Sequence, residues 1–551
     1  MNCRKNIKNL STGEKTELVQ AFLDLKNPAK APSQIPAAQA RGANSRYDDY
    51  VWLHTVINTG AHRRPGFLAW HRKFLDLLEK DLQDVAVNPN LTLPYWDWTD
   101  LSGSNPFTSD FLGGEGDGPN NRVTTGAFAY ATGNWNLNIP PESSLSIDPW
   151  LTRKSPLSNE TFATLPTAAE VLTMLNVTPL DASPWNDTSS NDGFRNRIEG
   201  WFGAPPVRFH NAGHVYVGGS MNPDSSPNDP VFFLHHANVD RLWAIWQQKH
   251  PTEPYVPGSG ESATLAGHRL GDNMALFGAH FGTDYTIDSV LDHKAGGYMY
   301  DTDIPSVTLD TPSIDFGNVP VGMTTYHAIR FRVESARQVR FRITAGPSGN
   351  FSQTPVSVFT AVPECGEPFV YGYVFVAYTS PNTITPTENS SVTVEAYFTD
   401  VEGFYTTNPG DDYSLLTETI DLLATPVPIQ KTAVALVLDR SGSMGSTATT
   451  SSTGVPITKA ELLKNAISVF SALMRPEDGI GVVTYDDIVD RLLNVTEMGP
   501  YSPIAAGSGR DGINAILSGA GLDPRGLTGI GAAIQEGKTT LADGQAAANA
   551  L

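Results

Sequence analysis

Two histidines near the middle of the chain have the spacing of metal ligands on a helix. His210 and His214 lie four residues apart in RFHNAGHVY, and on a helix this spacing stacks both imidazoles on one face, about one turn apart. Such a pair alone is weak evidence, because histidine is often a packed core or surface residue. Further histidines stand in similar surroundings of Trp, Phe and Pro, and they are His54, His62, His71, His235 and His236.

The residue types around these histidines limit the metals that they could bind. Imidazole suits copper, zinc, iron and nickel. Neither group of histidines contains a cysteine, and the nearby carboxylates do not resemble the two-histidine, one-carboxylate site of iron enzymes. Spacing alone therefore leaves the choice between copper and zinc open.

The segments that carry the histidines resemble the two copper-binding motifs of tyrosinases, catechol oxidases and molluscan hemocyanins. The first segment reads RYDDYVWLHTVI, AHRRPGFLAWHRKFLDLLEKDL and LTLPYWDWTD, and the second reads RNRIEGWFGAPPVRFHNAGHVYVGGSM and NDPVFFLHHANVDRLWAIW. The resemblance covers roughly residues 1–290 and implies two copper ions, with dioxygen as co-substrate. The implied ligands are His54, His62 and His71 for the first copper, and His210, His214 and His236 for the second. Because the family uses the second histidine of its HHxxxDR pattern, we expect His235 to be a packed neighbour.

The resemblance also assigns catalytic roles to Glu199 and Asn211. In tyrosinases, a glutamate and an asparagine at matching places are proposed to hold a water that deprotonates incoming monophenols. Both residue types are present here, which favours monophenol activity. The alternative for Glu199 is an ion pair with Arg195 or Arg197, since such pairs are common on helices.

Two acidic residues of the second segment could influence the site without binding metal. Asp240 lies four residues after His236, where its carboxylate could accept the N–H of a ligand imidazole and fix its tautomer. The alternative for Asp240 is a salt bridge with an arginine. Asp224 lies in the stretch Ser220–Asp229, which we expect to border the pocket mouth, and its charge could tune substrate binding.

The reaction implied by the resemblance is the oxidation of small phenolic substrates. Monophenols would be hydroxylated to catechols, and catechols would be oxidised by dioxygen to o-quinones. The alternatives are a catechol or o-aminophenol oxidase without hydroxylase activity, hemocyanin-like oxygen binding, and adhesion through the C-terminal segment as the main function.

The elements that must position the histidines are predicted to be helices. Apolar residues recur at helical spacing in residues 18–26, 74–85, 195–202 and 239–250. A polar stretch over residues 102–192 is rich in Ser, Thr, Asn, Gly and Pro, and we expect it to form surface loops. We therefore predict a mainly α-helical copper-binding bundle domain over residues 1–303.

Residues 304–430 have a different pattern. Short runs such as AIRFRVES, QVRFRITA, VSVFTAV, YGYVFVAY and SVTVEAYF alternate with a period close to two and are separated by turn signals. This pattern predicts an all-β sandwich, which is similar to immunoglobulin-like modules. Such a domain could cover the copper pocket or act as a spacer.

Residues 431–551 begin with an apolar strand, a Gly/Ser loop, a helix and a second strand, which predicts an α/β unit. The opening LVLDRSGSM resembles a von Willebrand factor A domain. That resemblance implies a protein ligand and a Mg²⁺ ion, with Asp439, Ser441, Ser443 and Thr528 as ligands. We expect this domain to be partial, because the sequence reaches Leu551 before the later strands and the third metal loop.

Composition narrows the classes of partner and compartment. With 37 basic and 58 acidic residues, the net charge is −21, which argues against nucleic acid and anionic membranes as partners. No stretch approaches the roughly 20 apolar residues that cross a bilayer. The first residues do not read as a signal peptide, so we expect the cytoplasm by default, with export by another route left open. The cysteines, Cys3 and Cys365, allow a single disulfide.

Overall fold

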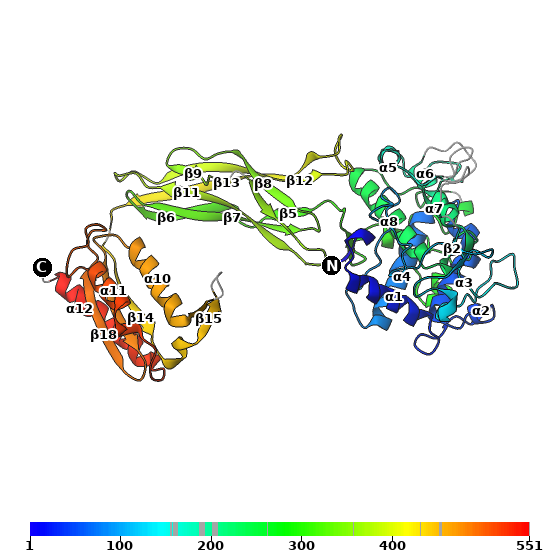
Figure 1. Ribbon diagram of the computed structural model, residues 1–551. Coiled ribbons are helices and arrows are strands. Elements are labelled where there is room, and N and C mark those ends of the chain that lie inside the picture. Colours follow the sequence, from blue (N-terminus) through cyan, green and yellow to red (C-terminus); the bar gives the residue numbers. More distant parts are fainter. Residues whose placement is uncertain are drawn as a thin grey trace. The chain divides into compact units, whose positions relative to one another are not determined.

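The structure is a computed structural model, and it describes residues 1–154, 157, 164–186, 193–200, 208–261, 263–355, 358–429, 431–450 and 455–549. The chain forms two compact units (Figure 1). Unit 1 comprises Met1–Gly317, Thr324–Thr379 and Thr387–Ala424, and unit 2 comprises Asn318–Met323, Ser380–Pro386 and Thr425–Leu551. Among the described residues, no helix is both long enough and apolar enough to span a bilayer.

Five helices of unit 1 surround the candidate site, and they are α3 (Arg46–Ala61), α4 (Phe67–Ala86), α6 (Phe194–Glu199), α7 (Phe209–Val217) and α8 (Val231–Lys249). Helix α8 is buried on all sides over its first 16 residues, Val231 to Trp246. A helix buried in this way lies at the centre of its domain. Helices α4 and α7 both pack against α8, so the histidine-bearing elements share one core.

The helices predicted from periodicity are present. Residues 18–26 lie in α1 (Thr12–Lys26), where Ser11 and Glu14 form a capping box, and residues 74–85 lie in α4. Residues 195–199 end α6, and residues 201–202 of the same prediction lie outside the described residues. Helix α6 stops at Gly200, whose φ is +101° and where a Cβ would lie 2.2 Å from the Arg208 carbonyl oxygen.

The long polar stretch contains elements that the sequence pattern did not predict, among them the short strands β2 (Gly116–Asp117) and β3 (Arg122–Val123) and one α-helix. Helix α5 (Ala168–Leu175) lies within the region expected to form loops, and Thr167 and Glu170 form a capping box at its start. Its apolar residues Val171, Met174 and Leu175 are buried. The capping box and the i, i+3, i+4 spacing of the apolar residues both indicate a helix. The prediction missed it because the helix is short and the sequence around it is polar.

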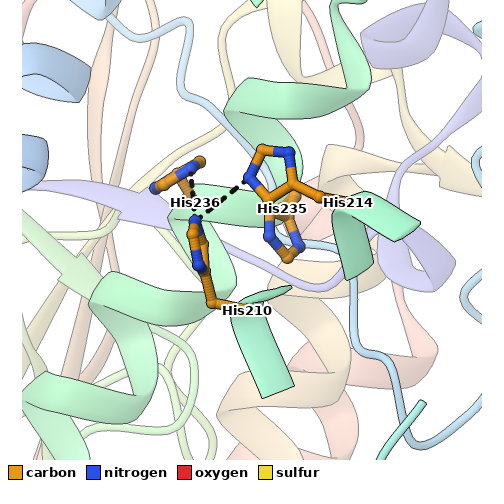
Figure 2. A group of neighbouring side chains, drawn as sticks. All are labelled: His210, His214, His235 and His236. Atoms are coloured by element: carbon orange, nitrogen blue, oxygen red, sulfur yellow. Dashed lines mark hydrogen bonds between the residues drawn. The ribbon is translucent and has the colours of Figure 1, made fainter. Parts of the chain in front are cut away.

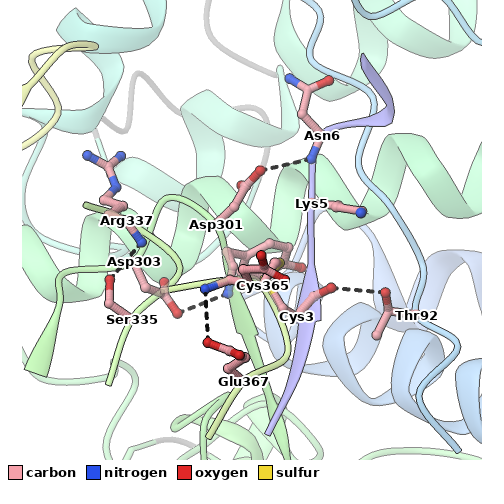
Figure 3. Close-up of a disulfide and its surroundings, with 12 residues drawn as sticks. Cys3, Lys5, Asn6, Thr92, Asp301, Asp303, Ser335, Arg337, Cys365 and Glu367 are labelled. Carbon is pink, nitrogen blue, oxygen red and sulfur yellow. Dashed lines mark hydrogen bonds between the residues drawn. A yellow bond between two sulfur atoms is a disulfide. The ribbon is translucent and has the colours of Figure 1, made fainter. Parts of the chain in front are cut away.

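A disulfide joins the N-terminal strand to a distant loop of unit 1 (Figure 3). Strand β1 (Asn2–Arg4) pairs in parallel with β4 (Tyr298–Tyr300), and Cys3 in β1 is bonded to Cys365, 362 residues later. The bridge that two cysteines allowed is therefore formed. In chain-entropy terms, closing so long a loop restricts the unfolded chain strongly.

The second half of unit 1 contains two β-sheets. One has the strand order β10-β8-β12-β13-β6 and the other the order β5-β7-β11-β9. The strand bounds are β5 (Ser306–Leu309), β6 (Ser313–Pro320), β7 (Thr324–Glu334), β8 (Val339–Ala345), β9 (Phe351–Gln353), β10 (Val358–Ala361), β11 (Val370–Thr379), β12 (Glu388–Asp400) and β13 (Asp411–Val427). Phe331 in β7 and Phe341 in β8 bring the sheets into contact, with ring centroids 4.8 Å apart. The immunoglobulin-like description stays a prediction.

Unit 2 contains the predicted strand–helix–strand order. Strand β14 (Ala433–Asp439) pairs in parallel with β17 (Gly479–Tyr485), and β17 pairs antiparallel with β18 (Val489–Glu497). The helices of this unit are α10 (Lys459–Leu473), α11 (Gly509–Ser518) and α12 (Ile530–Asn549). The parallel pair needs a crossover connection, which α10 provides.

Candidate metal centre

The first histidine group consists of His54, His62 and His71. His54 lies on α3, His62 directly follows α3, and His71 lies on the second turn of α4. Each residue offers one nitrogen, and these nitrogens lie within 4.8 Å of one another. The structure therefore brings together three imidazoles that the sequence separates by up to 17 residues.

Backbone carbonyls set the tautomers in this group. The Nδ1 of His54 donates to the Asp224 carbonyl oxygen at 2.6 Å, and the Nδ1 of His71 donates to the Phe67 carbonyl oxygen at 2.8 Å. A carbonyl only accepts, so the proton lies on Nδ1 and the Nε2 lone pair is free. Both Nε2 atoms are buried and have no hydrogen-bond partner within the described part of the chain. Buried acceptors left in this state fit a bound metal ion.

The second histidine group consists of His210 and His214 on α7 and His236 on α8 (Figure 2). The His210 Nε2 lies 3.0 Å from the His214 Nε2 and 3.2 Å from the His236 Nε2. The Nδ1 of His214 donates to the Met221 carbonyl oxygen at 2.7 Å, which leaves its Nε2 lone pair facing its neighbours. Converging lone pairs repel unless a cation lies between them.

The two histidine groups are in direct contact with each other. The rings of His71 and His236 are stacked with centroids 4.4 Å apart, and the rings of His62 and His210 lie 5.9 Å apart. The packing of α4 against α8 creates this contact, since His71 and His236 lie on those helices. The arrangement can hold two metal ions as neighbours.

Burial keeps these imidazoles neutral. Desolvation, followed by the neighbouring histidines, lowers the pKa of His54, His71, His210 and His236 well below the ordinary value of 6.5. Burial also lowers the pKa of His214, to about 4. Neutral imidazole is the form that binds a metal, so the groups are ready for one near neutral pH.

A fourth histidine, His235, lies inside the second group, and one of its nitrogens is within 4.8 Å of those of the other three. Its Nδ1 accepts a hydrogen bond from the Trp98 indole nitrogen at 3.0 Å. The role of His235 as a packed neighbour stays a prediction, and its hydrogen bond differs in kind from those of His54, His71 and His214.

Glu199 connects α6 to the first histidine group. Its carboxylate accepts from the Arg195 guanidinium at 3.0 Å and from the backbone N–H of Arg63 at 2.5 Å, next to His62. The ion pair with Arg195 that the sequence left open is thus present. The side-chain oxygen of Asn211 accepts from the His210 Nδ1 at 3.0 Å, so Asn211 orients a histidine of the second group. The catalytic roles of Glu199 and Asn211 stay predictions.

Asp240 forms the salt bridge with an arginine that the sequence left open, and its predicted contact with a ligand imidazole stays a prediction. Its carboxylate accepts from the guanidinium of Arg72, from the Tyr298 hydroxyl at 2.6 Å and from the Tyr300 hydroxyl at 2.7 Å. These partners lie on α4 and β4. Burial alone would raise the pKa of Asp240, but Arg72 and Arg4 outweigh it and lower the pKa.

Asp224 contributes through its backbone. Its backbone carbonyl accepts a hydrogen bond from the His54 Nδ1, whereas its carboxylate accepts one from the backbone N–H of Glu142 at 3.2 Å. The segment Met221–Asp224 therefore supplies one carbonyl to each histidine group. Sequence reasoning missed these acceptors because a backbone carbonyl has no residue-type signal.

Three of the predicted cation ligands of unit 2 make hydrogen-bond contacts within their own loop. The Asp439 carboxylate accepts from the Ser441 backbone N–H at 2.7 Å, and the hydroxyls of Ser441 and Ser443 lie 3.1 Å apart. The Thr528 segment lies near this loop, since the Gly442 backbone N–H donates to the Gly526 carbonyl at 3.0 Å. Cation binding by this loop stays a prediction.

Comparison with known proteins identifies one family domain in the first half of the chain and another in its last part. Residues 44–249 match the family model described as the common central domain of tyrosinase, and residues 434–550 match the von Willebrand factor type A domain. The chain is 38% identical over 313 residues to a tyrosinase from Streptomyces glaucescens, covering 55% of this chain and 100% of that protein. It is 39% identical over 288 residues to grixazone synthase from Streptomyces griseus, covering 47% of this chain and 88% of that protein.

A solved polyphenol oxidase from Thermothelomyces thermophila is 25% identical, with a TM-score of 0.42. The match covers 54% of this chain and 88% of that chain. The family assignment therefore rests on the sequence relatives.

Proposed function

Because the chain belongs to the tyrosinase family and is a tyrosinase-type oxidoreductase, we propose that it both hydroxylates monophenols and oxidises catechols to o-quinones. The family implies two copper ions, with dioxygen as co-substrate and phenols as substrates. The observation that carries the proposal is the pair of histidine groups, in which all imidazoles except the half-buried His62 are buried and the Nε2 atoms of His54 and His71 have no partner among the described residues.

The residues present fit two copper ions. Both histidine groups contain buried imidazoles whose pKa is lowered by burial, and imidazole is a ligand that suits copper. The first copper would be held by His54, His62 and His71, and the second by His210, His214 and His236. When bound, the metal pair supplies the electron exchange between dioxygen and the phenol.

The protein itself must remove a proton from the incoming phenol. Asn211 lies beside the second group, and its side-chain Nδ2 is buried without a hydrogen-bond partner among the described residues. That amide could donate to a water, and Glu199 could accept a proton through the same water. Arg195 and the Arg63 N–H hold the Glu199 carboxylate in place for this role.

The second candidate function is a catechol or o-aminophenol oxidase that lacks the hydroxylation step. One observation favours it. Both carboxylate oxygens of Glu199 already accept hydrogen bonds, one from Arg195 and one from Arg63, which would weaken Glu199 as a base.

A paired oxygen-uptake assay on the copper-loaded protein separates the two functions. One cell contains tyramine and the other contains L-DOPA. We expect uptake with both substrates, and we expect Glu199→Gln to lose the tyramine reaction by about 100-fold or more while keeping the L-DOPA reaction. Glu261→Gln, at an exposed glutamate, is the matched control.

Uptake with L-DOPA alone in the unmodified protein would overturn the hydroxylase proposal and support the catechol oxidase. Equal losses with both substrates in Glu199→Gln would show that Glu199 maintains the site rather than accepting the phenol proton. Uptake with neither substrate would overturn both candidate functions.

A further inference from the structure

Trp98 and His235 form a buried pair beside the second histidine group. Trp98 is 1% exposed and His235 is fully buried. The backbone N–H of Trp96 donates to the Leu234 carbonyl oxygen at 3.0 Å, which anchors the tryptophan segment against the first turn of α8. The Trp98 indole N–H then donates to the His235 Nδ1 at 3.0 Å. One backbone hydrogen bond and one side-chain hydrogen bond therefore fix the position of the Trp98–His235 pair.

This hydrogen bond gives His235 the tautomer opposite to that of its neighbours. An indole N–H only donates, so the His235 Nδ1 must be unprotonated and its Nε2 must bear the proton. The Nδ1 lone pair faces Trp98, and the protonated Nε2 has no lone pair for a metal. His54, His71 and His214 donate from Nδ1 to carbonyls, which leaves their Nε2 free.

The His235 ring nevertheless lies close enough to the group to matter. It stacks on His210 with centroids 5.2 Å apart and meets His214 edge-on at 4.9 Å. Gly213 leaves the space for it, since a Cβ there would lie 2.2 Å from the His235 Cε1. Packing thus helps to position the ring, and the hydrogen bond from Trp98 requires that the His235 Nδ1 be unprotonated.

We propose that Trp98 is a positioning residue that keeps His235 from becoming a fourth ligand of the second copper. A catalytic metal needs an open coordination position for its substrate, and a fourth imidazole would close it. Without the indole N–H, the His235 proton can move to Nδ1, and the freed Nε2 lone pair then competes for the metal. This inference rests on the proposed copper function and specifies how its second site stays open.

The test compares Trp98→Phe with a double variant in the full-length, copper-loaded protein. Trp98→Phe keeps an aromatic ring but removes the N–H. We expect it to keep two coppers per chain, to release copper more slowly to a chelator, and to lose L-DOPA uptake by about 10-fold or more. Trp98→Phe combined with His235→Phe removes the competing imidazole, so we expect uptake and copper release to return towards those of the unmodified protein.

Trp246→Phe is the matched control, because it also removes a buried indole N–H donor, which there bonds the Val177 carbonyl oxygen at 2.8 Å. Unchanged uptake and unchanged copper release in Trp98→Phe would overturn the proposal. It would also be overturned if the double variant lost uptake as fully as Trp98→Phe, because Trp98 would then act only by supporting the fold.

A second measurement tests the proposal even if Trp98→Phe does not fold. In copper-free protein labelled with ¹⁵N-histidine, subtraction of the spectrum of His235→Phe assigns the His235 nitrogens. We expect the shifts of an Nε2–H imidazole, and an Nδ1–H pattern would overturn the proposal. Copper release and tautomer do not depend on phenol oxidation, so failure of the proposed function would be recognised separately by the absence of uptake in the unmodified protein.

Discussion

The histidine groups of unit 1 and the Asp439 loop of unit 2 both follow metal-binding sequence patterns, but their donor atoms are in different states. The Nε2 atoms of His54 and His71 are buried and have no partner among the described residues. The Asp439 carboxylate instead accepts from the Ser441 N–H, and the Ser441 and Ser443 hydroxyls lie within hydrogen-bond distance of each other.

This difference bears on the free energy that metal binding would contribute. A buried acceptor without a partner carries a desolvation penalty of about 1–3 kcal/mol, which a metal ion removes. A donor set whose oxygens already accept hydrogen bonds must exchange them for the cation, so it gains less. Whether the ligand atoms already have hydrogen-bond partners therefore distinguishes a strong metal site from a weak one better than the sequence motif does.

The largest effect is expected from His71→Ala, which breaks the first group. The variant should bind about one copper instead of two, because one of three imidazoles is lost, and oxygen uptake should fall by more than about 100-fold. Copper content and L-DOPA uptake measure the two effects. His327→Ala, at an exposed histidine in β7, is the control. Full copper content in His71→Ala would contradict the ligand assignment.

An intermediate effect is expected from pH in the copper-free protein. The pKa of His214 is about 4 in the folded chain against an ordinary 6.5, so below pH 6.5 the unfolded chain binds more protons. Stability should be complete above pH 6.5 and fall as the pH drops towards 4, by about 3 kcal/mol for His214 alone.

Melting temperatures of the copper-free protein between pH 8 and pH 5 measure this loss. Copper-loaded protein should keep its melting temperature further into acid, because bound metal opposes protonation of the histidines. Identical profiles with and without copper would show that the buried histidines do not govern the acid limit.

The smallest effect is expected from Asp439→Ala in unit 2. Loss of the hydrogen bond from the Ser441 N–H should lower the free energy of unfolding by about 1 kcal/mol, with no change in copper content or oxygen uptake. Denaturant unfolding with and without added Mg²⁺ measures it. A clear stabilisation by Mg²⁺ that Asp439→Ala abolishes would support the predicted cation site and weaken the contrast with the histidine groups.

Much of the fold and of the candidate site could be predicted from local sequence. Helical spacing predicted α1 and α4, and alternation predicted strands such as β7 and β11, because both periods report which face of an element is buried. Helix α5 escaped prediction because it is short and lies in polar sequence. The partners of Asp240 also escaped, since Arg72, Tyr298 and Tyr300 are brought to it by the packing of distant elements.

The sequence by itself determined which residue types could bind metal and which helices carry them, because spacing along a helix follows from its fixed pitch. Only the tertiary structure decided which nitrogen bears the proton in His54, His71, His214 and His235. The carbonyls of Asp224 and Met221 leave Nε2 free on His54 and His214, whereas the Trp98 indole does the reverse to His235. A histidine has the same chemistry wherever it stands in a sequence, and its hydrogen-bond partner in the folded chain selects the nitrogen that can bind metal.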